Sequence, residues 1–105
     1  MNFKRMMRLG RQAGTLKADH PGAWLLGEEL AREALADRSP DLARMMRERS
    51  KEGIEFYVRQ VSEGVVRLVA DGEIEISEPV TEKALEALGI ACGMTLYDAL
   101  DKEAR

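Results

Sequence analysis

The chain has 105 residues, of which 45% are hydrophobic and 33% charged, and its net charge is −3. This length supports one domain, and the composition excludes a disordered or membrane-spanning chain, because no apolar run approaches the roughly 20 residues that cross a bilayer. Cys92 is the sole cysteine, which excludes an internal disulfide and predicts a reducing, cytoplasmic location.

The first segment fits an amphipathic helix over residues 3–13, with Gly14 as its stop. Its polar side carries four cations: Lys4, Arg5, Arg8 and Arg11. Cations at the start of a helix oppose the helix dipole, so they suggest a need for positive charge there. This basic face is a candidate site for an acidic partner protein, nucleic acid, an anionic membrane or the acidic C-terminal half of the chain. The alternative is a solvated outer face.

A second helix is predicted from Pro21 onward, with Asp19 or His20 as its cap. Its apolar side consists of Ala23, Trp24, Leu26, Leu30, Ala31, Ala34 and Leu35. Leu25 and Ala36 interrupt the opposite, charged side. An isolated domain does not need apolar residues there, so Leu25 is a candidate contact residue, although single apolar residues are common on surfaces.

A third helix is predicted from its start and stop signals, with Ser39 as the N-cap, Pro40 in the first turn and Gly53 as the end. Its outer side carries three cations: Arg44, Arg47 and Lys51. They form a second candidate surface for an acidic partner. Glu48 lies beside them, which favours a solvated face.

From Ile54 onward apolar and polar residues alternate, as is typical of a strand, and a turn at residues 62–64 leads to a second apolar run. Asp71-Gly72 followed by alternation over residues 73–77 is typical of a tight hairpin, whose turn requires a positive φ at Gly72. We therefore predict an antiparallel meander of three strands over residues 54–77. The alternative continues the third helix to Gly64 and leaves a two-stranded hairpin.

The C-terminal part is predicted to form two short helices. Thr81 caps the first, over residues 82–88, Gly89 ends it, and Thr95 starts the second. Residues 88–97 resemble a DNA-reading helix-turn-helix, which would place the segment TLYDALDKEAR in the major groove. That segment carries more acids than bases and would repel phosphates, so DNA binding is the less favoured interpretation.

The predicted fold class is therefore α+β, with helices packed on a small antiparallel meander or hairpin. The single domain has a helical part at residues 1–53, the meander or hairpin at residues 54–78 and the C-terminal helix pair at residues 81–105.

Few residues are suited to catalysis. His20 is the sole histidine and Cys92 the sole cysteine, so a zinc cluster of these ligands cannot form within one chain, and a catalytic pair would need these two residues. No glycine is followed by the residues of a phosphate-binding loop. Glu73 and Glu75 share one side of a predicted strand, where acids are usually solvated. We expect no enzyme, no cofactor and no metal.

The most favoured function is that of a small cytoplasmic regulator, inhibitor or adaptor that binds another protein. The alternative is a DNA-binding transcriptional regulator that uses the basic N-terminal face or the C-terminal helix pair. Residues 1–18 hold five bases and no acid, whereas residues 73–105 hold eight acids and three bases. Because the two ends attract each other and Leu25 interrupts a polar face, we also expect a homodimer.

Overall fold

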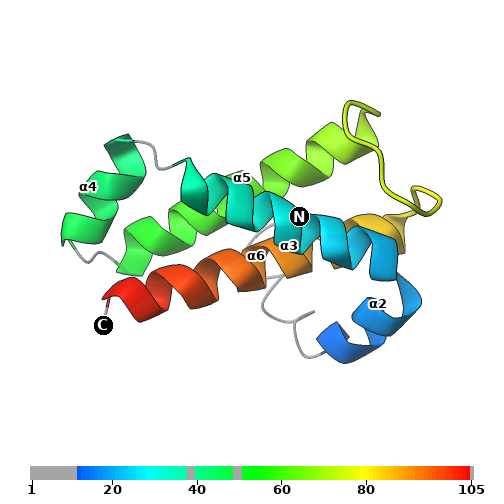
Figure 1. Ribbon diagram of the computed structural model, residues 1–105, viewed down its shortest axis with the longest axis horizontal. Coiled ribbons are helices and arrows are strands. Elements are labelled where there is room, and N and C mark those ends of the chain that lie inside the picture. The colour runs from blue at the N-terminus through cyan, green and yellow to red at the C-terminus, as the bar shows by residue number, and fades with distance from the viewer. Residues whose placement is uncertain (1–11, 38–39, 49–50, 105) are drawn as a thin grey trace.

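The computed structural model describes residues 12–37, 40–48 and 51–104, which form helices without a strand among them (Figure 1). The helices are α2 (Ala13–Asp19), α3 (Pro21–Ala36), α4 (Pro40–Glu48), α5 (Lys51–Ala70) and α6 (Glu82–Ala104). The predicted α+β fold class, with its meander or hairpin, is therefore wrong. The described chain is a helical bundle.

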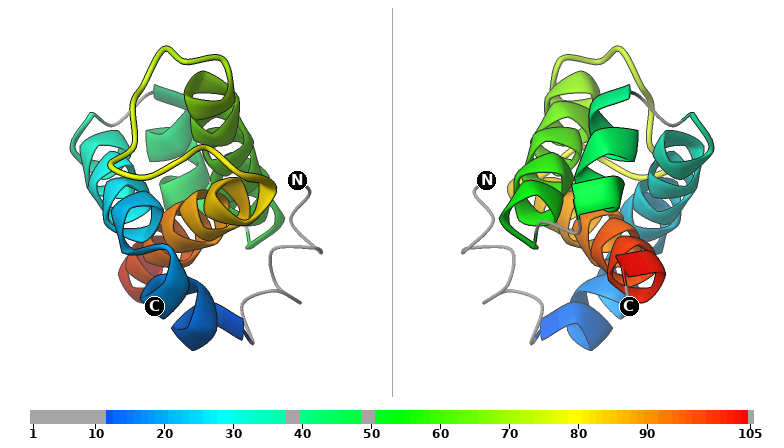
Figure 2. Two further views of the ribbon diagram at one scale, coloured as in Figure 1. Left: turned by 90° about the vertical axis from the view of Figure 1, so that its right-hand side faces the viewer. Right: turned by 90° about the vertical axis from the view of Figure 1, so that its left-hand side faces the viewer.

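Helix α6 lies at the centre of the bundle. Both α3 and α5 pack chiefly against α6, and only lightly against each other. Helices α3 and α6 run in the same direction and α5 runs opposite to them (Figure 1). Viewed end-on, the three lie at the corners of a triangle, with α2 against the end where α3 and α6 begin (Figure 2). None of the described helices is long and apolar enough to cross a membrane.

The predicted strands at residues 54–70 are helix α5. Its buried residues follow a helical period of three and four: Ile54, Val58, Ser62, Val65 and Val69. The alternation that predicted a strand spans only residues 54–59, and the longer helical period places one continuous side against α6. β-Branched residues reduce helix propensity by only tenths of a kcal/mol each, which such packing outweighs.

The helix end at Gly89 and the helix start at Thr95 that the sequence predicted are both absent, because α6 is continuous. Gly89 and Gly93 lie inside the helix, in a stretch from Glu86 to Gly93 that is buried throughout. Thr95 lies inside α6 and does not start a helix, and its hydroxyl donates a 2.7 Å hydrogen bond to the carbonyl of Ala91 one turn earlier. The pair of short helices and the helix-turn-helix of residues 88–97 are therefore wrong. Thr81 is correctly predicted as a cap, since its Oγ1 accepts the Ala84 N–H at 3.1 Å.

The crossing of α3 and α6 depends on small side chains. Ala23, Gly27 and Ala31 are one turn apart on α3 and all buried. A Cβ added to Gly27 would lie 2.5 Å from the backbone oxygen of Leu88 and 2.9 Å from the Cβ of Ala91. Glycine is therefore required where the two backbones meet, and the predicted apolar side of α3 is confirmed at Ala23, Trp24 and Ala31.

Asp71-Gly72 ends a helix and does not join two strands. Gly72 has φ of 79°, and its N–H donates to the carbonyl of Val69, while the Glu73 N–H donates to that of Leu68. This pair of bonds is the Schellman arrangement, which needs a left-handed residue just after the helix. The positive φ expected of Gly72 is therefore confirmed, but the hairpin is wrong because α5 reaches Ala70.

The remaining predictions concern the helix ends. Helix α3 begins at Pro21, as predicted, with His20 at its cap position. Gly14 lies within α2 and does not stop a helix. Helix α4 begins at Pro40 as expected, but it ends at Glu48, so Gly53 lies inside α5. The predicted helix of residues 3–13 falls almost wholly outside the described residues, as does the Ser39 cap.

Candidate functional site

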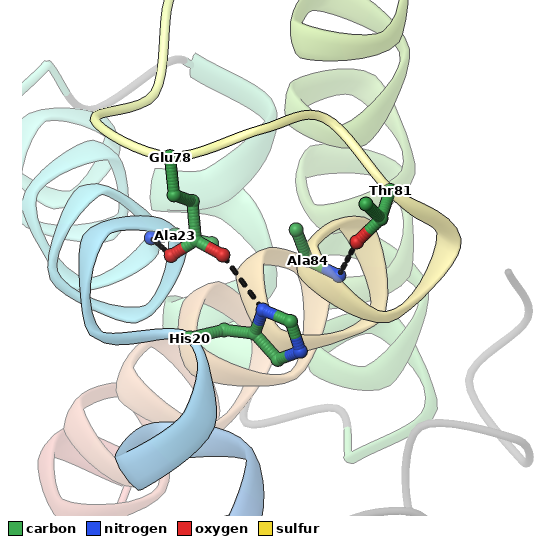
Figure 3. Close-up of polar contacts among 5 residues, drawn as sticks. All are labelled: His20, Ala23, Glu78, Thr81 and Ala84. Atoms are coloured by element: carbon green, nitrogen blue, oxygen red, sulfur yellow. Dashed lines mark hydrogen bonds and ion pairs between the residues drawn. The ribbon is translucent and has the colours of Figure 1, made fainter.

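The connection between α5 and α6 is tied to the start of α3 by one carboxylate (Figure 3). The Oε2 atom of Glu78 accepts the backbone N–H of Ala23 at 3.0 Å, and Oε1 lies 2.7 Å from Nδ1 of His20. Both side chains are mostly buried, with 21% of His20 and 14% of Glu78 exposed. We call this group, His20, Glu78 and the Ala23 N–H, the α3 clasp.

Two segments of the chain form the α3 clasp: the start of α3 and the connection between α5 and α6. His20 separates α2 from α3, and its side chain does not cap α3. The first N–H groups of a helix have no partner within the helix, so α3 needs an acceptor from elsewhere. Glu78 supplies it, and Gly22 leaves room, because a Cβ there would lie 2.6 Å from the Ser77 hydroxyl.

The helix dipoles favour a carboxylate at this end of the bundle. Since α3 and α6 are parallel, their positive N-termini lie at the same end (Figure 1). Burial raises the pKa of Glu78, but the hydrogen bonds from the Ala23 N–H and His20, together with the charge of His20, outweigh this effect, so the pKa is lowered from its ordinary value of 4.5. Glu78 is therefore ionised when it caps α3.

The only cysteine lies in a second, apolar environment. Cys92 is fully buried in α6, and this burial raises the pKa of its thiol to about 11, while the neighbouring Ser62 hydroxyl opposes the rise. The Ser62 oxygen is also buried, and among the described residues no partner reaches it with the geometry of a true hydrogen bond. We therefore regard Ser62 and Cys92 as a weak polar contact between α5 and α6. A thiol in this state is a poor nucleophile.

The sole histidine and the sole cysteine lie in these two different environments. His20 bonds to Glu78 and Cys92 lies beside Ser62, so the structure does not bring the sole histidine and sole cysteine together as a pair. In the described part of the chain, no three potential ligands gather where they could hold a metal ion. The α3 clasp can hold the connection of residues 71–81 on the bundle, which is a structural task.

The candidate contact residues from the sequence are separated in the structure. Leu25 lies on the outer side of α3, and 56% of its surface is exposed. Arg44 and Arg47 are exposed on α4, whereas Lys51 is exposed at the start of α5. The prediction that the three lie on one face of a single helix is therefore wrong. Lys4, Arg5, Arg8 and Arg11 lie outside the described residues.

Sequence reasoning missed two features. Glu78 had no local signal of its role, because the N–H that it caps is 55 residues away. Phe56 was assigned to a strand, but 51% of its surface is exposed on α5, with the Arg59 guanidinium 5.4 Å from the centre of its ring. A helical period applied to residues 54–69 would have placed Phe56 opposite the buried side.

No family model, curated protein or solved structure matches this chain.

Proposed function

We propose that this protein acts by binding another protein, without catalysing a reaction, and that the outer side of α3 around Leu25 is the contact surface. The observation that carries the proposal is the exposure of Leu25, of which 56% is accessible to solvent, more than for the other large apolar side chains in the described chain. Full burial of an exposed leucine contributes roughly 1.5–3 kcal/mol, so burial of the exposed 56% of Leu25 contributes roughly 1–2 kcal/mol.

The surroundings of Leu25 suit an interface. Exposed charged residues follow it on the same side of α3: Glu29, Arg32 and Glu33. An apolar anchor within a polar rim is the usual composition of a protein interface. Because acids outnumber bases on this rim, the expected partner presents an apolar pocket bordered by basic residues.

The surface is also held rigidly. Gly27 brings α3 into backbone contact with α6, and the α3 clasp bonds its first turn to Glu78. Binding to such a surface loses little conformational entropy, since its helix is ordered before the partner arrives. Rigidity of this kind favours recognition by a preformed surface over folding upon binding.

A pull-down with matched variants tests the proposal. Leu25→Gln removes the apolar anchor and keeps a good helix former, while Val80→Gln makes the same change of polarity at an exposed apolar residue outside α3 and is the control. We expect a protein from the native host that is retained by the parent and by Val80→Gln, and at least tenfold less by Leu25→Gln. The same contrast should then appear in direct binding to the purified partner.

Two outcomes would contradict the proposal. The first is equal retention of every captured protein by the parent and Leu25→Gln. The second is tight binding of the parent to heparin or mixed DNA that falls steeply as salt rises, because this dependence is typical of nucleic-acid binding.

A further inference from the structure

The outer side of α5 faces away from the core along the whole helix. The buried side of α5, from Ile54 to Val69, packs on α6. On the opposite side, four residues one turn apart form what we call the α5 stripe: Phe56, Gln60, Gly64 and Arg67. Phe56, Gln60 and Arg67 are exposed and Gly64 is half-buried.

Two residues of the α5 stripe are unfavourable for the isolated chain. Phe56 leaves 51% of an aromatic side chain in water. Gly64 lies in the middle of a helix, where glycine costs about 1 kcal/mol relative to alanine, yet nothing lies within 4 Å of the position that its Cβ would take. Unlike Gly27, Gly64 is therefore not required by any neighbour in the described chain. A large exposed side chain, Phe56, therefore lies two turns from a position without a side chain, Gly64. Such an arrangement is suited to packing against another helix.

The charged residues of α5 could pair with those of a second, antiparallel α5. Of the six charged residues of α5, four lie on the stripe or next to it and alternate in sign: Glu52, Arg59, Glu63 and Arg67. Lys51 and Glu55 lie farther round the helix. Glu52, Glu63 and Arg67 form no ion pair within the part of the chain that the structure describes. If a second α5 lies antiparallel with Gln60 opposite Gln60, Glu52 faces Arg67 of the other copy and Arg59 faces its Glu63.

We propose that the α5 stripe is the interface of a twofold homodimer, in which two α5 helices pack antiparallel around Gln60. In this register the Phe56 side chain of each copy lies in the same layer as Gly64 of the other and fills its gap. A twofold interface must be complementary to itself, which both the charge order and the Phe56–Gly64 pairing provide. Antiparallel helix dipoles also attract. The proposal is independent of the partner proposed for Leu25.

The expected dimer is weak. A helix of 20 residues is about 30 Å long, so pairing along α5 alone gives an interface at the small end of specific complexes. We therefore expect a dissociation constant on the order of 10–100 µM. Sedimentation velocity over a concentration series should show an average mass that rises toward twice that of the monomer.

Charge exchange tests the register. Glu52→Arg alone places two cations opposite each other, and Arg67→Glu alone places two acids opposite each other, so each single variant should associate at least tenfold more weakly than the parent. The double variant Glu52→Arg/Arg67→Glu restores both pairs and should recover dimerisation. An equimolar mixture of the two single variants should form a heterodimer, because each supplies the charges that the other lacks.

Size exchange tests the packing. Gly64→Leu fills the gap without meeting any described neighbour, so it should fold at least as stably as the parent and yet remain monomeric. Phe56→Ala should also be monomeric, whereas Leu25→Gln should dimerise like the parent. A parent that stays monomeric at about 500 µM, well above the expected dissociation constant, would overturn the proposal. So would a dimer that Gly64→Leu and the single charge variants leave unchanged.

Discussion

The same substitution should have opposite effects on stability at two glycines of this protein. Gly64→Ala and Gly27→Ala each add one methyl group to the interior of a helix. In an unobstructed helix, this change raises the free energy of unfolding by about 0.5–1 kcal/mol, because alanine has less backbone entropy to lose. Gly64 is unobstructed, since nothing lies within 4 Å of the position that the added methyl group would take. There the full gain is expected.

At Gly27 the methyl group collides with α6. It would lie 2.5 Å from the Leu88 carbonyl oxygen and 3.1 Å from the Cys92 nitrogen, both backbone atoms that no side-chain rotation can move. Helix α3 must therefore shift away from α6 and loosen its contacts at Ala23 and Ala31. Overpacking of this kind costs about 1–3 kcal/mol or more, which exceeds the helix gain. We expect a net loss of about 1–2 kcal/mol.

Thermal unfolding in dilute solution, where the chain is monomeric, measures both effects. For a domain of this size, 1 kcal/mol corresponds to a shift in Tm of about 4–8 °C, so the two variants should differ by about 6 °C or more. Circular dichroism reports on the helices, and the fluorescence of Trp24, the sole tryptophan, reports on the buried side of α3. A Gly27→Ala variant that melts at or above the parent would refute the close crossing of α3 and α6.

Three further predictions concern the helix ends and the buried thiol. Gly72→Val should lower the free energy of unfolding by about 1 kcal/mol or more in urea titrations, because valine disfavours the φ of 79° at the end of α5. Gly64→Val, at a helical φ and with nothing within 4 Å of the added Cβ, is the control and should lose no stability. Glu78→Gln should lower stability at neutral pH by about 1 kcal/mol, as expected for the loss of a charged helix cap. Because the folded pKa of Glu78 is lowered, its contribution is present above pH 4.5 and disappears as the pH falls through the folded pKa, so parent and variant should converge in acid. Convergence at neutral pH would contradict the cap. Cys92 should react with a thiol reagent only as fast as the protein opens, since its thiol is buried with a pKa of about 11; rapid labelling of the folded protein would contradict this placement.

Local signals in the sequence predicted some helices and some ends correctly. Helix α3 follows from Pro21 and from an apolar side with a clear helical period, and Thr81 caps α6 as expected. Gly72 was correctly expected to need a positive φ. Its context was not predicted, because a left-handed glycine serves equally well in a hairpin turn and after a helix.

The candidate site was less predictable. Leu25 could be placed on an outer helix side because the period of α3 is regular, and its exposure agrees with that placement. The α3 clasp could not be predicted, since it joins His20 to a carboxylate 58 residues away. The exposure of Phe56 was missed because the short alternation around it satisfies a strand and a helix equally well.

By itself, the sequence determined which residues are apolar, where helices can begin and where the backbone must turn left-handed. The tertiary structure decided whether ambiguous segments become helix or strand. A β-branched run such as residues 54–69 has a weak preference, and packing one side of it on α6 outweighs that preference. Likewise, Gly89 and Gly93 end a helix only where solvent or a turn can satisfy the freed backbone groups. Both glycines are buried in α6, where ending the helix would leave backbone N–H and carbonyl groups without solvent. The continuous helix instead pairs these backbone groups with one another.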